Sequence, residues 1–339
     1  MPPVPRKAPT MADVARLAGV SPMTVSRAFK ADSSVSDVTR EAILKAAEDL
    51  GYVFDSTASN LRSQKTNFIA VTVPSINNAN FAETVRGLSE RLKPRGLQIL
   101  LGYTDYDMAE EERLIEQFLR RRPEAIVVTG GRHTPRARRL LENAGIPVVE
   151  TWDLPEQPIG HVVGFSNAGA VRGMVDHFVA RGLANIAFIG GDATRDTRGA
   201  DRRAGFVAAM HSHGLDATRL VAAGVPPISM REGAEAMRHL LEQLPDTQAV
   251  ICVSDLSAYG ALTECQRRGV EVPGQVSIAG FGDYEIAGIS VPPLTTVNPF
   301  PSKIGTLTGD LILAALDGLQ EGPRTIRIET ELLIRDSSR

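Results

Sequence analysis

The sequence predicts an α/β protein in which an all-α N-terminal domain with a helix-turn-helix precedes two doubly wound subdomains built on parallel sheets. Residues 10–54 contain three short amphipathic helix patterns with their own start and stop signals. From residue 67 onward, short β-branched runs alternate with amphipathic helices, which is typical of parallel βαβ units. The roughly 270 residues of this second part exceed one open sheet of usual size, so we expect two subdomains facing each other across a cleft.

The composition narrows the class of protein. The chain has 339 residues, 43% of them hydrophobic, and no apolar run approaches the ~20 residues of a membrane helix. No charged-then-apolar leader opens it, so we expect a cytoplasmic protein that does not contact a membrane. The net charge is −3, yet residues 1–65 hold nine Lys and Arg against seven Asp and Glu. The N-terminal part is therefore mildly basic, whereas the rest of the chain is acidic.

The cysteines and histidines do not form a metal-binding pattern. Cys252 and Cys265 are too few for a disulfide framework, and no C-x-x-C pair occurs. We therefore expect two buried thiols, no metal site and no cofactor.

The N-terminal elements follow from their capping residues. Residues 1–9 are rich in proline, which is typical of a disordered arm. Thr10 precedes the first helical pattern with an acidic residue three positions later, as in a capping box. Ser21 caps the second helix, with Pro22 at its first position, and Ser36 caps the third. Three helices joined by a glycine-containing turn make residues 10–54 a helix-turn-helix domain.

Residues 55–65 form a hinge segment that is polar and can support only one or two helical turns. The strands expected after it are 68–73, 97–101, 125–129, 148–151, 162–165, 186–189, 249–253, 276–279 and a last one at 325–334. We assign residues 66–165 plus 296–325 to one subdomain and residues 166–295 plus 326–339 to the other. Ligands of such folds bind outside the carboxyl ends of the strands.

The head of the chain resembles the DNA-binding domain of the LacI/GalR family of repressors. The resemblance lies in TMADVARLAGVSPMTVSRAF at 10–29 and VSDVTREAILKAAEDLGYVFD at 35–55. The body is similar to the same family in RRAGF at 202–206, SDLSAYGAL at 254–262 and IAGFGD at 278–283, and further on in PPLTTV. The resemblance implies a periplasmic-binding-protein-like body and a homodimer that binds a near-palindromic double-stranded DNA operator under the control of a small effector.

Within the family, the sequence is most similar to the gluconate-operon repressors. The motifs that carry this similarity are PMTVSR at 22–27, FAETVRG at 81–87, HTPR at 133–136, VGFSN at 163–167 and ECQRRG at 264–269. The similarity implies that the effector is gluconate or a related sugar acid, phosphorylated or free.

The family places base-reading side chains at the start of the second helix, in the major groove. Pro22, Met23 and Arg27 match those positions. Arg27 can contact guanine O6 and N7 in bidentate fashion, whereas the other two offer apolar contact to a thymine methyl. Ser21 and Thr39 can also serve only as helix caps. The residues assigned to DNA are Ser21, Pro22, Met23, Thr24, Ser26, Arg27, Ser34, Thr39 and, as a minor-groove wedge in the hinge, Leu61.

The resemblance also places the effector site. Arg202 matches an arginine that holds effector hydroxyls or a carboxylate, and a forked cation suits an acid sugar. Gly282 stands where many members carry a sugar-binding aspartate, and its lack of charge favours an anionic effector. The residues assigned to the effector are Phe81, Thr129, His133, Trp152, Phe165, Arg202, Ser254, Asp255 and Asp283.

Other function classes stay open at this point. A plain sugar-binding protein with the same body would need a secretory leader and no helix-turn-helix. An enzyme would need a nucleophile motif or a phosphate loop, and neither G-x-S-x-G nor a P-loop occurs, so we expect no enzymatic activity. Within the family, the effector could be a neutral sugar, a phosphosugar or a nucleobase, acting as inducer or corepressor.

Overall fold

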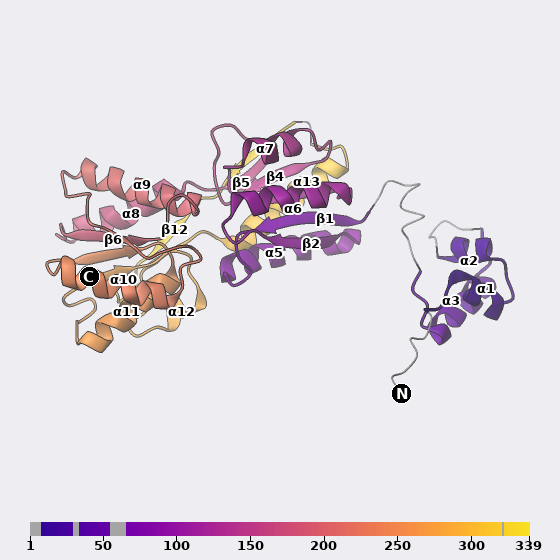
Figure 1. The fold of residues 1–339 in the computed structure, drawn as a ribbon, viewed down its shortest axis with the longest axis horizontal. Coiled ribbons are helices and arrows are strands. Elements are labelled where there is room, and N and C mark those ends of the chain that lie inside the picture. The colour runs from indigo at the N-terminus through magenta and orange to yellow at the C-terminus, as the bar shows by residue number, and fades with distance from the viewer. Residues whose placement is uncertain (1–7, 30–33, 55–65, 321) are drawn as a thin grey trace. The chain divides into compact units, whose positions relative to one another are not determined.

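The structure, a computed structural model, describes residues 8–29, 34–54, 66–320 and 322–339 (Figure 1). Its contacts divide the chain into two compact units, residues 1–65 and 66–339. Most of the predicted N-terminal arm and the whole of the predicted hinge, with Leu61, lie outside the described residues.

Unit 1 is the predicted three-helix domain, and its helices begin where the caps predicted. The helices are α1 (Met11–Leu17), α2 (Pro22–Ala28) and α3 (Asp37–Leu50). The Ser21 hydroxyl accepts a hydrogen bond from Thr24 N at 3.2 Å, and Ser36 does the same for Thr39 N at 3.4 Å. The core of the unit consists of Val14, Ala15, Val25, Ala28, Ile43, Ala46 and Ala47. Each helix therefore contributes one apolar face and leaves the other exposed.

The first lobe of unit 2 contains a six-stranded parallel sheet in the order β11-β5-β4-β3-β1-β2. Its strands are β1 (Phe68–Val73), β2 (Gln98–Tyr103), β3 (Ala125–Thr129), β4 (Val148–Thr151), β5 (His161–Gly164) and β11 (Thr325–Arg327). Its helices are α5 (Ala79–Leu92), α6 (Met108–Arg120), α7 (Pro135–Glu142) and α13 (Pro301–Leu316), with the 3-10 turn η1 (Lys93–Arg95). Alternate residues of β1 enter the two hydrophobic clusters on opposite faces of the sheet, which is the doubly wound arrangement.

The second lobe contains a four-stranded parallel sheet in the order β7-β6-β8-β9. Its strands are β6 (Ile186–Gly190), β7 (Leu220–Ala222), β8 (Ala249–Cys252) and β9 (Ser277–Ala279). Its helices are α8 (Asn167–Ala180), α9 (Thr197–Ser212), α10 (Met230–Gln243), α11 (Asp255–Arg268) and α12 (Glu285–Ile289). A short antiparallel pair, β10 (Thr296–Asn298) with β12 (Glu331–Leu333), adds a further ladder. The predicted fold class is confirmed.

The end of the chain differs from the expected single strand at 325–334. Residues 325–327 extend the first sheet beside β5, whereas residues 331–333 pair with β10. Strand β7 was not predicted either, because a three-residue edge strand with exposed ends lacks a buried β-branched run. The two cysteines are free and buried, as expected. Among the described residues, no helix is both long and apolar enough to cross a membrane.

Candidate DNA interface and effector cleft

The face of α2 that points away from the core of unit 1 is exposed and chemically mixed. Val25 and Ala28 point into the core of unit 1, so the opposite face of the helix is free. Met23 is 65% exposed, and Ser21, Pro22 and Arg27 are exposed beside it. A surface of this kind can offer a guanidinium, two hydroxyls and an apolar side chain to a groove of DNA. Ser34 is also exposed, and Ser26 and Thr39 are half-buried.

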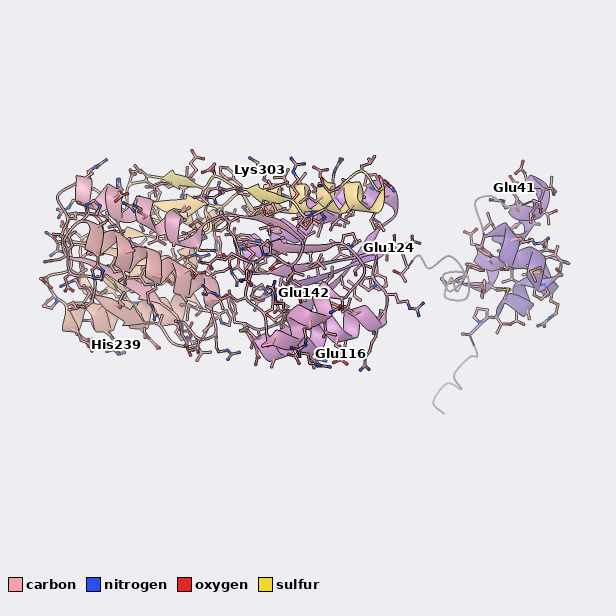
Figure 2. All side chains as sticks on the ribbon, turned by 90° about the horizontal axis from the view of Figure 1, so that it is seen from above. Glu41, Glu116, Glu124, Glu142, His239 and Lys303 are labelled. Atoms are coloured by element: carbon pink, nitrogen blue, oxygen red, sulfur yellow. The ribbon has the colours of Figure 1, made fainter. Side chains whose placement is uncertain are left out.

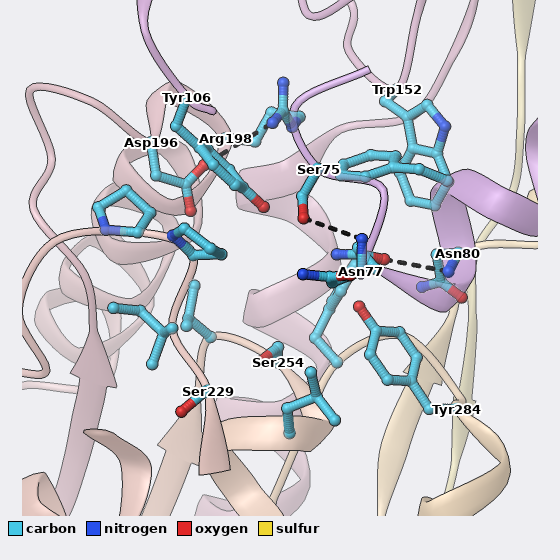
Figure 3. Close-up of a pocket in the computed structure, with 18 of the residues that line it drawn as sticks. Ser75, Asn77, Asn80, Tyr106, Trp152, Asp196, Arg198, Ser229, Ser254 and Tyr284 are labelled. Carbon is cyan, nitrogen blue, oxygen red and sulfur yellow. Dashed lines mark hydrogen bonds and ion pairs between the residues drawn. The ribbon is translucent and has the colours of Figure 1, made fainter. Parts of the chain in front are cut away.

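Unit 2 contains a cavity of about 170 Å³ between its lobes, at the carboxyl ends of strands from both sheets (Figure 3). The first lobe contributes residues that follow β1, β2 and β4, and the second contributes residues that follow β6, β8 and β9. The lining residues are Ser75, Asn77, Asn78, Asn80, Phe81, Tyr106, Trp152, Asp196, Arg198, Arg202, Pro226, Pro227, Ile228, Ser229, Val253, Ser254, Leu256, Phe281 and Tyr284.

Arg202 is the most constrained charge in this cavity. Its side chain is buried, with Nε donating to Asn167 Oδ1 at 3.1 Å and Nη1 donating to Val253 O at 2.9 Å. Its guanidinium lies over the Phe281 ring. Burial lowers the pKa of Arg202, but an arginine stays protonated at neutral pH. Among the described residues, no acceptor is hydrogen-bonded to Nη2, so this nitrogen can still donate.

Arg198 is a second buried cation, one helical turn before Arg202 on α9. Its Nη1 donates to Thr129 O of the first lobe at 3.3 Å. Its guanidinium also lies 5.7 Å from the Phe81 ring and 5.9 Å from the Tyr106 ring. Asp196 is 4.0 Å away and is the only carboxylate among the lining residues. Figure 3 shows Arg198, Asp196 and Tyr106 together at one end of the cavity. The fixed charge of the lining is therefore net +1.

The other end of the cavity carries uncharged polar groups. Figure 3 shows Asn77, Asn80 and Tyr284 there, opposite the charged residues. Burial raises the pKa of Tyr284, and it also raises the pKa of Tyr106, at the charged end of the cavity, to about 12. Both phenols therefore stay protonated at neutral pH and can donate as well as accept hydrogen bonds. Such a surface suits a ligand with several hydroxyl groups.

Comparison with known proteins agrees with the two-unit fold described above. The model of bacterial regulatory proteins of the lacI family matches residues 10–55, and the model of periplasmic binding protein-like domains matches residues 175–338. The HTH-type transcriptional regulator GntR of Pseudomonas aeruginosa is 36% identical to this chain, over 97% of it and 96% of that protein. The chain belongs to the LacI family.

Solved structures agree with this assignment. A LacI-family protein from Silicibacter pomeroyi has a TM-score of 0.91 and 31% identity, and it covers 98% of this chain and 100% of its own. A second LacI-family regulator from that organism is 43% identical, with a TM-score of 0.76, over 80% of this chain and 99% of its own. Membership of this family makes the protein a transcriptional repressor. Its relatives are named as regulators and not as enzymes.

Four of the residues predicted to contact the effector lie at the cavity of this LacI-family repressor. They are Phe81, Trp152, Arg202 and Ser254. The indole Nε1 of Trp152 donates to Thr84 Oγ1 at 3.2 Å, and the Ser254 hydroxyl caps α11, so both side chains are also tied to the protein.

The other five predicted effector residues do not line the cavity. Phe165 packs behind it, between the rings of Trp152 and Phe281. The Thr129 side chain donates to Thr72 O at 2.9 Å, and only its carbonyl contacts Arg198. The remaining three, His133, Asp255 and Asp283, form hydrogen bonds or ion pairs with other groups of the protein.

The bonds of these three residues explain their positions. His133 Nδ1 lies 2.8 Å from Glu111 Oε2 within the first lobe. Asp255 is fully buried and accepts hydrogen bonds from Tyr284 N at 2.8 Å and from Thr296 Oγ1 at 2.6 Å. Burial raises its pKa to about 7. Asp283 pairs with Arg335 at 2.6 Å.

Gly282 has a structural reason to lack a side chain. Its φ of +130° is open to glycine and strained for other residues. A Cβ there would overlap the Tyr284 ring and lie 2.8 Å from Asn80 Nδ2. The space that a carboxylate would take is therefore filled by a neutral phenol.

Most of the polar lining was not predicted from the sequence, including Ser75, Asn77, Arg198, Ser229 and Tyr284. The S-x-N-N-x-N run after the first strand was a detectable signal, because loops at carboxyl ends of strands form the cleft. Arg198 lies one helical turn from Arg202, so the spacing also indicated a second arginine on the same face. Within the part of the chain that the structure describes, no cluster of three or more His, Cys, Asp or Glu could hold a metal.

Proposed function

We propose that this repressor responds to a small polyhydroxylated monocarboxylate, with gluconate as the first candidate. The observation that carries the proposal is the pair of buried arginines, Arg198 and Arg202, in a cavity that is otherwise lined mostly by neutral polar and apolar groups. The resemblance to gluconate-operon repressors and the relationship to GntR support the same class of ligand.

The charges favour one carboxylate. Two buried cations face a single acid, Asp196, and a ligand with one negative charge would neutralise the remaining cation. The free Nη2 of Arg202 offers a charge-assisted hydrogen bond to a carboxylate oxygen. A neutral sugar would leave this buried charge uncompensated.

The size and polarity of the cavity favour a short open-chain or single-ring ligand. About 170 Å³ is below the range of about 300–1,000 Å³ that is usual for drug-sized ligands. Asn77, Asn80 and the two tyrosines supply donors and acceptors for several hydroxyls. Phe81, Trp152 and Phe281 supply apolar faces against which the carbon chain can pack.

Polar contacts between the two lobes of unit 2 couple ligand binding to the relative position of the lobes. Arg132 of the first lobe pairs with Asp201 of the second at 2.5 Å and donates to Thr197 O at 3.1 Å. Arg195 of the second lobe donates to Asp105 O of the first at 2.9 Å. A ligand that bridges the lobes stabilises this arrangement, and its preference for one arrangement shifts the population of the repressor between states.

On the DNA side, the exposed end of α2 reads bases in the major groove. Arg27 and Met23 make base contacts, the exposed hydroxyls bind phosphates, and Leu61 of the hinge is a minor-groove wedge. A homodimer places two such helices on the half-sites of a near-palindrome. Exposed apolar side chains on β2 (Leu101, Tyr103) and at the end of α12 (Ile289, Val291) favour self-association.

The test is a thermal-shift panel on the full-length protein with gluconate, 6-phosphogluconate, 2-ketogluconate, glucose and galactose. At about 100 times its dissociation constant, a ligand stabilises the folded state by about 2.7 kcal/mol, which is a shift of a few degrees. We expect a shift with sugar acids and none with neutral sugars, followed by altered operator affinity with the same acid. A shift with a neutral sugar alone would contradict the proposal.

A further inference from the structure

The strands β10 and β12 connect the lobes of unit 2. β10 leads from the second lobe into α13 of the first, whereas β12 follows β11 of the first sheet and leads back to the second lobe. The two strands pair in antiparallel fashion. The residues after β12 are bonded to the second sheet, where Ile278 N donates to Ser337 O at 2.8 Å. Figure 1 accordingly shows α13 in the first lobe and the C-terminus in the second. We call β10 and β12 the connecting ladder.

A loop of the effector cavity is bonded to this ladder. The loop is residues 280–284, between β9 and α12, and it carries Phe281 and Tyr284, which line the cavity. Its backbone meets β10, because Gly282 N donates to Val297 O at 2.8 Å. The same short loop therefore contacts both the space for the effector and a strand that leads into the first lobe.

The side chain of Asp283 joins the loop to both strands of the ladder. Its Oδ2 accepts a hydrogen bond at 3.0 Å from Nδ2 of Asn298, the last residue of β10. Its Oδ1 accepts at 2.6 Å from Nη2 of Arg335, two residues after β12. We call Asp283, Asn298 and Arg335 the ladder triad. The side chains of Asp283 and Arg335 are only 22% and 24% exposed, so water weakens this charged contact less than it would at the surface.

The first lobe is bonded to the same stretch of chain. Asn298 Oδ1 accepts from Phe300 N at 2.7 Å, so Asn298 also holds the start of α13. The Thr84 hydroxyl donates to the carbonyl of Pro301, the first residue of α13, at 3.1 Å. The same hydroxyl accepts at 3.2 Å from the indole of Trp152, which lines the cavity. A series of contacts thus joins cavity residues of both lobes through the end of β10 and the start of α13.

We propose that Asp283 and Asn298 are positioning residues that transmit effector binding from the 280–284 loop to the first lobe, without contacting the effector. Neither residue is among those that line the cavity. A ligand shifts the population of lobe arrangements only if a contact differs between the arrangements, and the Asp283–Asn298 hydrogen bond is a contact between the effector loop and the chain that enters the first lobe. The inference rests on the proposed function in using gluconate as the probe, and it goes further by naming the residues that carry the response.

The experiment breaks the Asp283–Asn298 contact and then restores it. N298D keeps an acceptor for Phe300 N but places a second carboxylate against Asp283, and the like charges repel. The exchange variant D283N/N298D restores the contact, because the new amide accepts from Arg335 with its oxygen and donates to the new carboxylate with its nitrogen. N298A removes the contact without adding a charge and is measured alongside.

The second lobe supplies a matched control in N185D. Asn185 Nδ2 donates to Asp246 Oδ2 at 2.9 Å, and Asp246 Oδ1 accepts from Arg219 Nη2 at 2.8 Å. The three residue types and their contacts are those of the ladder triad, but these residues precede β6, β7 and β8, at the amino ends of the strands of the second sheet. N185D therefore introduces the same repulsion away from the connecting ladder.

Fluorescence anisotropy measures operator affinity of the full-length proteins with and without gluconate, on an operator obtained by selection from random duplexes. We expect gluconate to change the operator affinity of the unmodified protein and of N185D by roughly 5- to 150-fold, the usual size of allosteric coupling. N298D and N298A should still bind gluconate in calorimetry but lose most of this change, and D283N/N298D should recover it. A full response in N298D, or a loss that D283N/N298D does not recover, would overturn the proposal. Loss of gluconate binding in N298D and N298A would also overturn it, because Asn298 would then belong to the effector site.

Hydrogen exchange without ligand keeps this test separate from the effector proposal. If gluconate gives no thermal shift with the unmodified protein, the effector proposal fails by itself, and the exchange data decide this one. N298D should then speed amide exchange both in the 280–284 loop and in α13 and α5 of the first lobe, because the broken contact joins them. D283N/N298D should restore slow exchange in all three segments, and N185D should leave them unchanged. Faster exchange in the loop alone, with α13 and α5 unaffected, would overturn the proposal.

Discussion

The guanidinium carbon of Arg202 lies 3.7 Å from the centre of the Phe281 ring, in a stacked contact at the base of the cleft. The ring covers one face of the cation, while Asn167 Oδ1 and Val253 O hold two of its nitrogens. A buried cation over an aromatic face gains about 2 kcal/mol or more. These contacts fix the direction in which the remaining nitrogen points, so the guanidinium is held in one orientation.

Replacing Arg202 by lysine keeps the charge but loses the planar fork. A lysine cannot hold both Asn167 and Val253 while it contacts a ligand. We expect R202K to weaken gluconate binding at least tenfold, because a charged hydrogen bond contributes about 1.5–3 kcal/mol. Titration calorimetry measures the affinity, and operator binding without ligand should persist. The neighbouring Arg203, whose Nη2 donates to Gly191 O, provides the control R203K. Equal losses in both variants would argue against a ligand contact.

Gly282 should tolerate no side chain. Alanine there would adopt a strained φ and overlap the Tyr284 ring, so we expect G282A to lower the free energy of unfolding by about 1–3 kcal/mol. Gly288, in α12, has open space around its Cα and an ordinary φ, so G288A serves as the matched control with little effect. Chemical denaturation of the two variants measures the difference. Similar stability in both would show that the loop at 280–284 can rearrange.

The sequence predicted the sheets well because buried parallel strands are continuous β-branched runs. The run at 125–129, for example, is β3 residue for residue. The caps were equally informative, since Ser21 and Ser36 act through contacts within one turn of chain. Local signals of this kind do not depend on the rest of the fold.

The cleft was harder to predict because its residues meet only after both lobes have formed. His133 illustrates the problem: a histidine after a strand, in a motif of the gluconate-operon type, is buried against Glu111 instead of the cavity. Asp255 similarly holds the 280–284 loop through Tyr284 N. Whether a polar side chain serves the ligand or a neighbouring loop depends on long-range packing, which spacing in the sequence does not record.

The pair of Arg132 and Asp201 should strengthen ligand binding without touching the ligand. The pair joins the lobes at 2.5 Å and is partly exposed, so we expect it to contribute about 0.2–1 kcal/mol. D201N should therefore weaken gluconate binding up to about fivefold. The reversed pair R132D/D201R should recover part of the loss, because it restores the attraction. A double-mutant cycle by calorimetry tests this, and a coupling energy of zero would contradict it.

His133 should make the stability of unit 2 depend on pH in a defined direction. Burial opposes its positive charge, but the carboxylates of Glu111 and Glu150 outweigh that effect and raise the pKa of His133 to about 9. Because the folded state then holds the proton more tightly than the unfolded state, the stabilisation is complete below about pH 6.5. It is lost as the pH rises through about 9. We expect the unmodified protein to lose more stability than H133Q between pH 6.5 and 9 in denaturant titrations.

An exposed histidine on α10 provides the comparison for this pH effect. His239 lies on the surface of the second lobe (Figure 2), so H239Q serves as the histidine-to-glutamine control outside the buried His133 cluster. Parallel curves for H133Q and the unmodified protein would show that His133 does not carry the proton.

Arg27 should read bases rather than phosphates. It is exposed in the last turn of α2, on the side opposite Val25 and Ala28. If its guanidinium contacts guanine O6 and N7, R27A should lose about 1–3 kcal/mol on the selected operator and little on random DNA, with relaxed preference at one base position. The control R16A removes an exposed arginine from α1 that pairs with Asp13 within unit 1. Equal losses on operator and random DNA would assign Arg27 to the phosphate backbone instead.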